Sequence, residues 1–265
     1  MQPLDVLYEV DGLPAYDLPD ELSTLYGGAL GFVEPRVVAN FVSTVDGIVA
    51  VPGVPQSNRR IRAGSEADRF VMGLLRACAD VVLVGSSTLH GSPRTRWTPE
   101  HAFPSTAAAF DELRRRRGQP RDPPLAVVTG SGALDAGHPA LVAGALVLTT
   151  EQGADRLRGR LPPASEVLPL GTGASVDPRD AVAALLARGH RLVLCEAGPH
   201  LFGSILAAGL VDELFLTTSP LIAGRPRGDV RLGLSEGTDL PSGRLSLLGL
   251  RREGDHVLSR YRLVR

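Results

Sequence analysis

The chain has 265 residues, of which 43% are hydrophobic and 22% are charged, so it can bury one substantial core or two small ones. Its formal net charge of −1 gives no overall attraction to a polyanion such as a nucleic acid. Lysine is absent, which excludes a Walker A loop, because that motif needs a lysine on the phosphates.

Membrane, disulfide and metal signals are also missing from the sequence. No stretch approaches the ~20 apolar residues of a membrane span, and the acidic N-terminal residues lack the apolar region of a signal peptide. Cys78 and Cys195 lie in apolar runs, which is typical of small core residues, and the six histidines show no metal-ligand spacing. The arginine run at 113–118 has acids beside it, which favours a solvated helix face. We therefore expect a soluble, cytoplasmic protein without a membrane, nucleic-acid or metal partner.

The first half of the chain predicts strands that alternate with helices. Residues 36–42 and 80–85 are continuous apolar runs, which are typical of strands covered on both faces. Residues 65–79 have helical spacing, with Ser65 as a plausible N-cap and acids in the first turn. Residues 105–118 predict a second helix, which ends at a glycine.

A tight turn follows the first predicted strand. Asp46 and Gly47 form a pair of residues that favours hairpins and tight turns. The apolar residues 48–51 come directly after this turn. We therefore expect them to continue the strand at 36–42 or to pair with it.

The second half of the chain repeats the alternation and then changes pattern. Strands are predicted at 125–130, 145–150, 166–170, 191–196 and 212–222, and helices at 177–189 and after Pro199. The helix at 177–189 has an aspartate at its cap, a proline at its first position and a glycine as its stop. Residues 244–265 alternate as two antiparallel strands around Gly254 and Asp255.

These elements predict an α/β fold of three layers, with a mostly parallel central sheet, helices on both faces and antiparallel C-terminal strands. We expect one domain over residues 31–265, preceded by an N-terminal extension over residues 1–30. The breaks at 52–58, 91–104 and 223–243 are too short for domain linkers. We interpret them as loops at the sheet edge where ligands bind in such folds.

Two strand ends carry the chemistry of a phosphate site. One strand ends at Gly85 and runs into Ser86, Ser87 and Thr88, and another ends in Glu196, Ala197, Gly198 and Pro199. Glycine lets a backbone approach a phosphate, and hydroxyls and N–H groups at a helix start bind it. Two such turns at neighbouring strand ends could together bind one dinucleotide. Each turn taken alone is also consistent with an ordinary helix cap. The Gly-x-Gly segments at 129–133 and 171–175 lack the rest of a dinucleotide fingerprint and are interpreted as loops.

Three blocks in order, residues 39–50, 64–89 and 193–225, resemble the reductase domain of riboflavin-biosynthesis pyrimidine reductases. The most specific block reads E-A-G-P-x-L-x-G followed by L-V-D-E-L. The resemblance covers about residues 36 to 264 and implies a dihydrofolate-reductase-like fold. The zinc deaminase domain of bifunctional relatives needs H-x-E and P-C-x-x-C, and neither motif occurs here.

The resemblance implies NADPH as the cofactor, bound by the two glycine turns. The residues that it assigns to the cofactor are Gly85, Ser87, Thr88, Thr129, Glu196, Ala197, Gly198, Pro199 and Leu201. Among these, Thr129 is expected at the adenosine 2′-phosphate end of the cofactor.

The resemblance also implies that Asp46 faces the substrate as a catalytic residue. A carboxylate there could hydrogen-bond the N–H groups of a pyrimidine or handle a proton near the hydride acceptor. Turn chemistry alone is the alternative for Asp46. The residues assigned to substrate binding are Asn40, Ser43, Ser57, Arg60 and Arg62. Arginines at 59, 60 and 62 could bind a phosphate, or could form a solvated basic loop.

The sequence departs from the family in its substrate half. The family usually carries Asp-Asp-Pro after the G-x-x-T turn, whereas this chain has Gly91, Ser92 and Pro93. The family also carries Ser-x-Trp before the first long helix, where this chain has the segment 57–69. The cofactor half therefore matches the family better than the substrate half.

Together these features predict an NADPH-dependent reductase that transfers hydride to the sugar C1 imine or carbonyl of a ribosylaminopyrimidine. The substrate would be of the 5-amino-6-(5-phosphoribosylamino)uracil type, in riboflavin biosynthesis. One alternative is a reductase of dihydrofolate or another pterin-like substrate. The other is a nucleotide-binding regulatory domain without turnover. A homodimer is expected from the resemblance.

Overall fold

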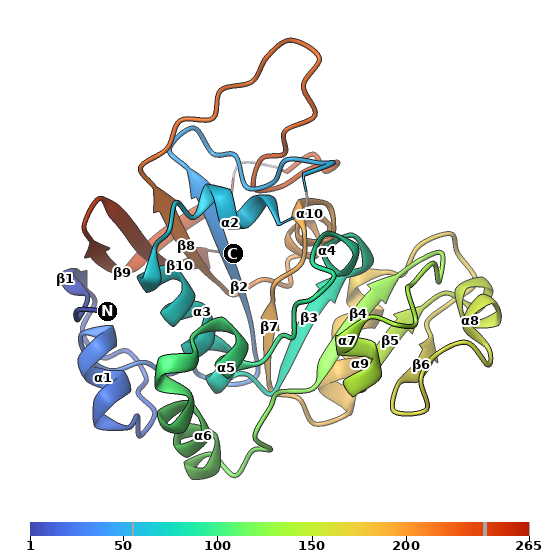
Figure 1. Ribbon diagram of the computed structural model, residues 1–265, viewed down its shortest axis with the longest axis horizontal. Helices are drawn as coiled ribbons and strands as arrows, with labels where there is room; N and C mark the ends of the chain where they lie inside the picture. Colours follow the sequence, from blue (N-terminus) through green and yellow to red (C-terminus); the bar gives the residue numbers. More distant parts are fainter. Residues whose placement is uncertain (55, 241–242, 265) are drawn as a thin grey trace.

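The computed structural model describes residues 1–54, 56–240 and 243–264 (Figure 1). The predicted segments 52–58, 223–243 and 244–265 also contain residues 55, 241–242 and 265, which lie outside the described residues. Within the described residues, ten strands form one sheet in the order β1-β9-β10-β8-β2-β7-β3-β4-β5-β6. The strands are β1 (Asp5–Glu9), β2 (Arg36–Thr44), β3 (Val81–Gly85), β4 (Leu125–Thr129), β5 (Ala145–Thr149), β6 (Glu166–Pro169), β7 (Leu192–Cys195), β8 (Glu213–Ser219), β9 (Arg244–Glu253) and β10 (His256–Val264).

The longer helices lie where the sequence predicts them, and several short helices lie in predicted loops. The helices are α1 (Asp20–Tyr26), α2 (Ser57–Ile61), α3 (Glu66–Cys78), α4 (Ser86–Gly91), α5 (Pro99–Ala102), α6 (Ala107–Arg116), α7 (Pro139–Ala143), α8 (Glu151–Leu157), α9 (Pro178–Ala187) and α10 (Pro199–Ala207), with a 3₁₀ turn at Pro104–Thr106. Both predicted N-caps are confirmed. The Ser65 side chain accepts a hydrogen bond from Asp68 N at the start of α3, and Asp177 caps α9.

The strand pairing confirms the predicted fold class. Parallel pairing runs from β8 through β2, β7, β3, β4 and β5 to β6. Antiparallel pairing joins β8 to β10, β10 to β9 and β9 to β1. The sheet is therefore mostly parallel, with antiparallel C-terminal strands.

The core lies on both faces of this sheet, which makes three layers. In β3, Val82 and Val84 belong to one buried cluster, whereas Val81 and Leu83 belong to the other. The first cluster includes residues of α3 and α6, and the second includes residues of α9 and α10. The continuous apolar runs of the central strands follow from this double coverage.

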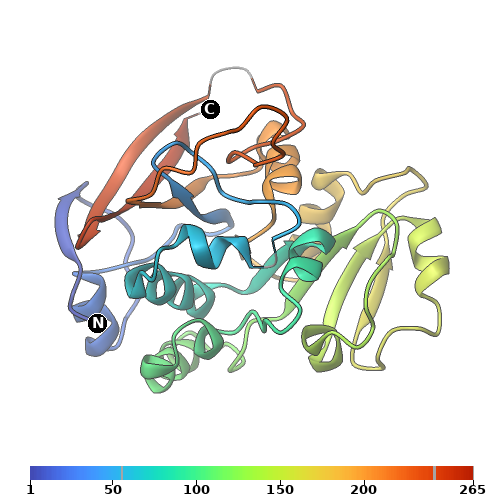
Figure 2. The same ribbon diagram turned by 45° about the horizontal axis from the view of Figure 1, so that its top comes forward.

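The expectation that residues 48–51 form a strand with β2 is wrong. On one side β2 pairs with β8 as far as Thr44, and on the other side it pairs with β7 over Arg36–Ala39. After the turn, the Thr44 amide donates to Ile48 O at 3.0 Å, and the chain then leads away from β2. Ala50 then forms an isolated antiparallel bridge with Leu232, in the loop after β8. Figures 1 and 2 show these two loops beside each other.

Residues 1–30, expected as an extension ahead of the domain, pack into the same core. Strand β1 pairs with β9 at the edge of the sheet, where Figure 1 shows it beside α1. Leu22, Tyr26 and Leu30 are each at most 2% exposed and belong to the cluster that includes α3.

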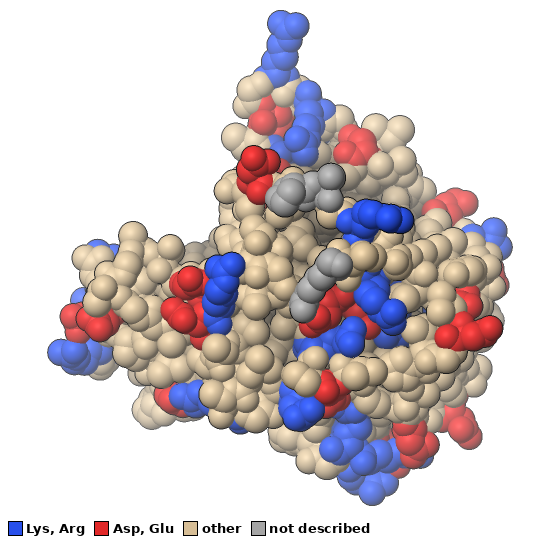
Figure 3. Space-filling model, turned by 180° about the vertical axis from the view of Figure 1, so that it is seen from behind, with Lys and Arg blue, Asp and Glu red and all other residues tan. Residues whose placement is uncertain are grey.

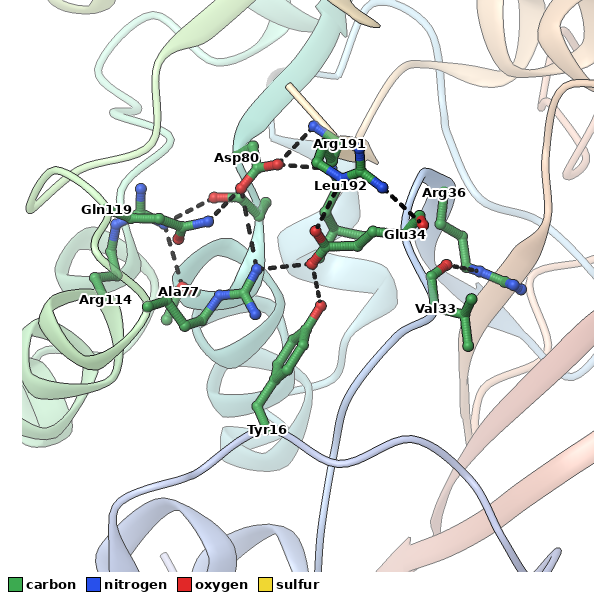
Figure 4. Close-up of polar contacts among 12 residues, drawn as sticks. Tyr16, Val33, Glu34, Arg36, Ala77, Asp80, Arg114, Gln119, Arg191 and Leu192 are labelled. Carbon is green, nitrogen blue, oxygen red and sulfur yellow. Dashed lines mark hydrogen bonds and ion pairs between the residues drawn. The ribbon is translucent and has the colours of Figure 1, made fainter. Parts of the chain in front are cut away.

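A polar network closes the amino ends of the central strands (Figure 4). Glu34 accepts hydrogen bonds from the Tyr16 hydroxyl at 2.6 Å and from Arg117 at 2.9 Å. Asp80, directly before β3, accepts from the backbone amides of Arg191 and Leu192 at 2.6 and 2.8 Å. This end of the sheet is therefore occupied by structural contacts, and the carboxyl ends are left for a ligand.

Charged side chains of both signs are interspersed on the face shown in Figure 3. The expectation of a solvated face for the arginine run of α6 holds only in part: Arg115 and Arg116 pair with Glu112, whereas Arg114 is buried. Among the described residues, no helix combines the length and the apolar character needed to cross a membrane.

Candidate active site

A cavity of about 1120 Å³ lies at the carboxyl ends of β2, β3 and β7. Its wall comes from the end of β2, the loop and α2 that follow, one face of α3, α4, and the turn between β7 and α10. Typical small-molecule sites measure about 300–1,000 Å³. The cavity therefore has room for a cofactor and a substrate together.

The two glycine turns meet in this cavity. Gly85 is the N-cap of α4 and Gly198 is the N-cap of α10, and β3 and β7 are paired neighbours. A Cβ placed on Gly198 would lie 3.3 Å from Thr88 Oγ1 and 3.6 Å from Ser87 Oγ. Because glycine has no side chain to cap a helix, the first-turn N–H groups of both helices stay available to a ligand.

Most of the predicted cofactor residues line the cavity, and three lie outside its lining. The lining includes Ser87, Thr88, Glu196, Ala197, Gly198 and Pro199. Gly85 and Leu201 pack against each other, because a Cβ on Gly85 would lie 3.4 Å from Leu201 Cδ2. Thr129 is buried, and its hydroxyl accepts a hydrogen bond from Gly132 N at 3.2 Å. Gly85 and Leu201 therefore lie behind the two glycine turns, whereas the turn that Thr129 holds contributes no residue to the lining.

Arg76, which the sequence analysis missed, holds the turn after β7. Its guanidinium donates from Nε to Glu196 Oε1 at 2.9 Å and from Nη2 to Oε2 at 2.6 Å. The side chains of Arg76 and Glu196 are 3% and 9% exposed, so this bidentate pair is buried. A third bond runs from Arg76 to Thr98 O at 3.2 Å. The sequence signal that could have identified Arg76 is its position: it is a charged residue among the apolar residues of the predicted helix at 65–79.

Asp46 uses its carboxylate to hold the loop after β8. It accepts hydrogen bonds from the Thr44 hydroxyl at 2.5 Å and from the amides of Ala223 and Gly224 at 3.0 and 2.6 Å. The bond from Thr44, together with those from the two amides, lowers the pKa of the Asp46 carboxyl to about 2. Asp46 lies outside the cavity lining. Its contacts are those of a turn residue, and its catalytic role stays a prediction.

The predicted substrate residues divide between the cavity and its surroundings. Asn40, Ser57 and Arg62 line the cavity, whereas Ser43 is buried within β2. Arg60 lies outside the lining, and its neighbour Arg59 lies within it. The reason is the unpredicted helix α2: residues three apart share a helix face, so Arg59 and Arg62 point the same way.

Asp68 is a second cavity residue that the sequence analysis did not single out. It is 5% exposed, and its carboxylate lies 3.8 Å from the Arg62 guanidinium. Burial raises the pKa of the Asp68 carboxyl, and the charge of Arg62 opposes that rise. Its position in the sequence indicated only an acid of a first helical turn.

Neither cysteine is exposed to the cavity. Cys78 and Cys195 are both free and fully buried, and burial raises the pKa of each thiol to about 12. Among the described residues, no group of histidine, cysteine or acidic side chains is arranged to hold a metal ion. The polar groups of the cavity wall are carboxylates, arginines, hydroxyls, side-chain amides and the imidazoles of His90, His101 and His200.

Comparison with known proteins supplies the context of this site. The chain matches the RibD C-terminal domain over residues 35–257. Among solved structures, a pyrimidine reductase-like protein from Corynebacterium diphtheriae is 23% identical, with a TM-score of 0.66, and the match covers 94% of this chain and 96% of that chain. RibD from Acinetobacter baumannii is 16% identical with a TM-score of 0.63, matched over 92% of this chain and 60% of its own.

The riboflavin biosynthesis reductase Rib7 from Saccharomyces cerevisiae is 14% identical, with a TM-score of 0.58 and coverage of 93% of this chain and 95% of that chain. Among curated proteins, none matches the chain significantly. The structural likenesses show a shared fold, and the sequence match extends over most of the chain. The protein belongs to the family of the RibD C-terminal domain.

Proposed function

We propose that the protein is an NADPH-dependent reductase of a ribosylaminopyrimidine of the 5-amino-6-(5-phosphoribosylamino)uracil type, acting in riboflavin biosynthesis. Family membership supports this reaction class. The observation that carries the proposal is the contact between the turns at Gly85 and Gly198 within one cavity. Phosphates of a dinucleotide need N–H groups and hydroxyls that converge in this way.

The residues around the two turns fit such a cofactor. A side chain at Gly198 would press on Thr88 and Ser87 and fill the space where a phosphate would approach. Ser87, Thr88 and the first-turn amides of α4 and α10 would hold the phosphates. When bound, the cofactor supplies the hydride. The roles predicted for Gly85, Thr129 and Leu201, and the preference for NADPH over NADH, stay predictions.

The chain itself would position the substrate and exclude water. The cavity continues from the turns to α2 and α3, where Arg59 is an exposed cation on its wall. We expect Arg59 to bind the substrate phosphate, because a guanidinium matches phosphate geometry. Phe41, Met72 and Trp97 form apolar parts of the lining and would keep water from the sugar C1 that accepts the hydride.

The test follows NADPH absorbance with purified protein and the ribosylaminopyrimidine, and compares wild type with Gly198→Val. We expect wild type to consume NADPH only when the substrate is present. The variant should bind NADPH at least about tenfold more weakly, which corresponds to ~1.4 kcal/mol. Gly243→Val is the matched control, since a Cβ there meets no atom within 4 Å.

Other outcomes would assign the cavity differently. Tight NADPH binding without substrate-dependent oxidation would favour a regulatory nucleotide-binding domain. A preference for dihydrofolate or another pterin by orders of magnitude would favour the pterin reductase. The homodimer and the cytoplasmic location stay predictions, to be checked by sedimentation and by cell fractionation.

A further inference from the structure

Helix α3 directs three evenly spaced side chains into the cavity. Asp68, Met72 and Arg76 are four residues apart, so they share one face, and all three line the cavity. Arg76 is bound to Glu196 at the turn after β7. Asp68 lies eight residues earlier, which is about 12 Å along the helix at ~1.5 Å per residue. It therefore belongs to the far end of the cavity, away from the turns.

Asp68 shares that end with Arg62. Nη1 of Arg62 lies 3.8 Å from Oδ2 of Asp68, which is within reach of an ion pair but too long for a hydrogen bond. The two side chains are 14% and 7% exposed, and both line the cavity. Among the described residues, the Arg62 guanidinium makes this ion pair and no hydrogen bond. The N–H groups of the guanidinium therefore remain available to a ligand.

The surrounding structure holds both groups in place. The backbone carbonyl of Arg62 lies 2.9 Å from Nε2 of His256, at the start of β10. Thr217, in β8, lies beside Asp68, and its hydroxyl lowers the pKa of the Asp68 carboxyl against the effect of burial. The Arg62 backbone is therefore anchored to β10, and Asp68 lies against β8, before any ligand arrives, which reduces the entropy lost on binding.

The pair offers an acceptor beside a donor. A carboxylate accepts hydrogen bonds and a guanidinium donates them, so the matching ligand edge presents an N–H next to a C=O. That edge is the cyclic amide, or lactam, of a pyrimidinedione ring. A phosphate suits this place poorly, because a phosphate at Arg62 would also meet the Asp68 carboxylate.

We propose that Asp68 and Arg62 recognise the lactam edge of the substrate ring, with Asp68 accepting from the ring N–H and Arg62 donating to the adjacent carbonyl oxygen. This proposal rests on the proposed function for the identity of the substrate. It adds the residues that select the heterocycle, separately from those that hold the cofactor or the phosphate.

The test is direct binding by calorimetry, with 5,6-diaminouracil and its 1,3-dimethyl analogue as probes. The analogue keeps the ring and both carbonyls but has no ring N–H. Wild type should bind diaminouracil about tenfold or more tightly than the analogue, since hydrogen bonds to charged groups are the strong ones. In Asp68→Ala, and also in Arg62→Gln, this ratio should fall toward one.

Glu66→Ala is the matched control, because Glu66 is an acid of the same helical turn whose side chain is 55% exposed. It should keep the wild-type ratio. Circular dichroism checks that each variant folds, and the wild-type comparison of the two probes needs no variant. Equal binding of both probes by wild type, or an unchanged ratio in folded Asp68→Ala, would overturn the proposal.

The readout also separates this proposal from the function on which it rests. Absence of substrate-dependent NADPH oxidation counts against the proposed function, whereas the probe ratio concerns ring recognition alone. A pterin carries the same lactam edge and serves as a third probe. Asp68-dependent binding of the pterin without binding of diaminouracil would support lactam recognition and assign it to a different ring.

Discussion

Arg76 and Glu196 form the charged contact on which the turn after β7 depends. Both side chains are buried, and both carboxylate oxygens are engaged. Truncating one partner would leave the other charge buried and unpaired, which costs about 3–5 kcal/mol. We expect Arg76→Ala to lower the free energy of unfolding by that amount in a denaturant titration.

A surface pair provides the comparison for that experiment. Arg115 pairs with Glu112 on α6, where the arginine side chain is 74% exposed. Because exposed ion pairs contribute about 0–1 kcal/mol, Arg115→Ala should change the free energy of unfolding by less than about 1 kcal/mol. Similar losses in both variants would contradict the structural role of Arg76.

Asp46 is expected to make stability depend on pH in a narrow acid range. Its folded pKa of about 2 lies below the ~3.9 of an unfolded aspartate, so the folded state favours the charged form. The stabilisation is present above pH ~4 and is lost as pH falls through ~2. The difference in unfolding free energy between wild type and Asp46→Asn should therefore be constant at neutral pH and shrink below pH ~4.

The same variant separates the two roles considered for Asp46. If the carboxylate only holds the loop, Asp46→Asn should speed proteolysis at residues 221–232, and kcat should change little. A steep fall in kcat while the loop stays protected would support the predicted catalytic role.

At the level of elements, α3 joins the core to the site. Its glycine at position 73 packs against α5 and α6: a Cβ there would lie 3.2 Å from Pro99 O and 2.8 Å from Phe110 Cζ. Gly73→Ala should therefore destabilise the protein by about 1–3 kcal/mol, despite the ~1 kcal/mol that alanine gains in helix propensity. Thermal unfolding measures this.

Gly91→Ala shows what alanine does without the clash. Gly91 is the last residue of α4, and a Cβ there meets no atom within 4 Å. The two variants should change the melting temperature in opposite directions or by clearly different amounts. Equal changes would mean that the contact with Phe110 relaxes without cost.

Local sequence patterns predicted α3 and its Ser65 cap, but not which polar residues of the helix face the cavity. Asp68 looked like a first-turn acid, and its burial depends on Arg62 and on strands far along the chain. The prediction of a strand at 48–51 was wrong for a similar reason. Its composition suits a strand, but Ala50 pairs with Leu232 in the loop after β8, and the choice of partner is a property of the assembled fold.

At the scale of the whole molecule, the N-terminal segment is needed for the core. Leu22, Tyr26 and Leu30 are at most 2% exposed, and burying such a side chain contributes about 1.5–3 kcal/mol. Their sum is comparable with the ~5–15 kcal/mol that separates folded from unfolded domains. Deletion of residues 1–30 should therefore give insoluble or unfolded protein.

Soluble yield and circular dichroism check this prediction. A triple substitution of Asp5, Glu21 and Thr24 to alanine is the control, because these exposed positions leave the apolar contacts intact. A stable, folded deletion variant would contradict the dependence of the core on this segment. The alternation of apolar runs predicted the parallel sheet well, whereas nothing local marked β1 as the partner of β9.

The loops after β2 and β8 share the Ala50–Leu232 bridge and the bonds from Ala223 and Gly224 to Asp46. Ala50 and Leu232 also line the cavity, so the joined loops form one wall of it. Because the two loops are tied at both points, we expect them to open together. Ligand escape past this wall should then show a single rate constant, and a substitution in either loop should change the residence times of cofactor and substrate by the same factor.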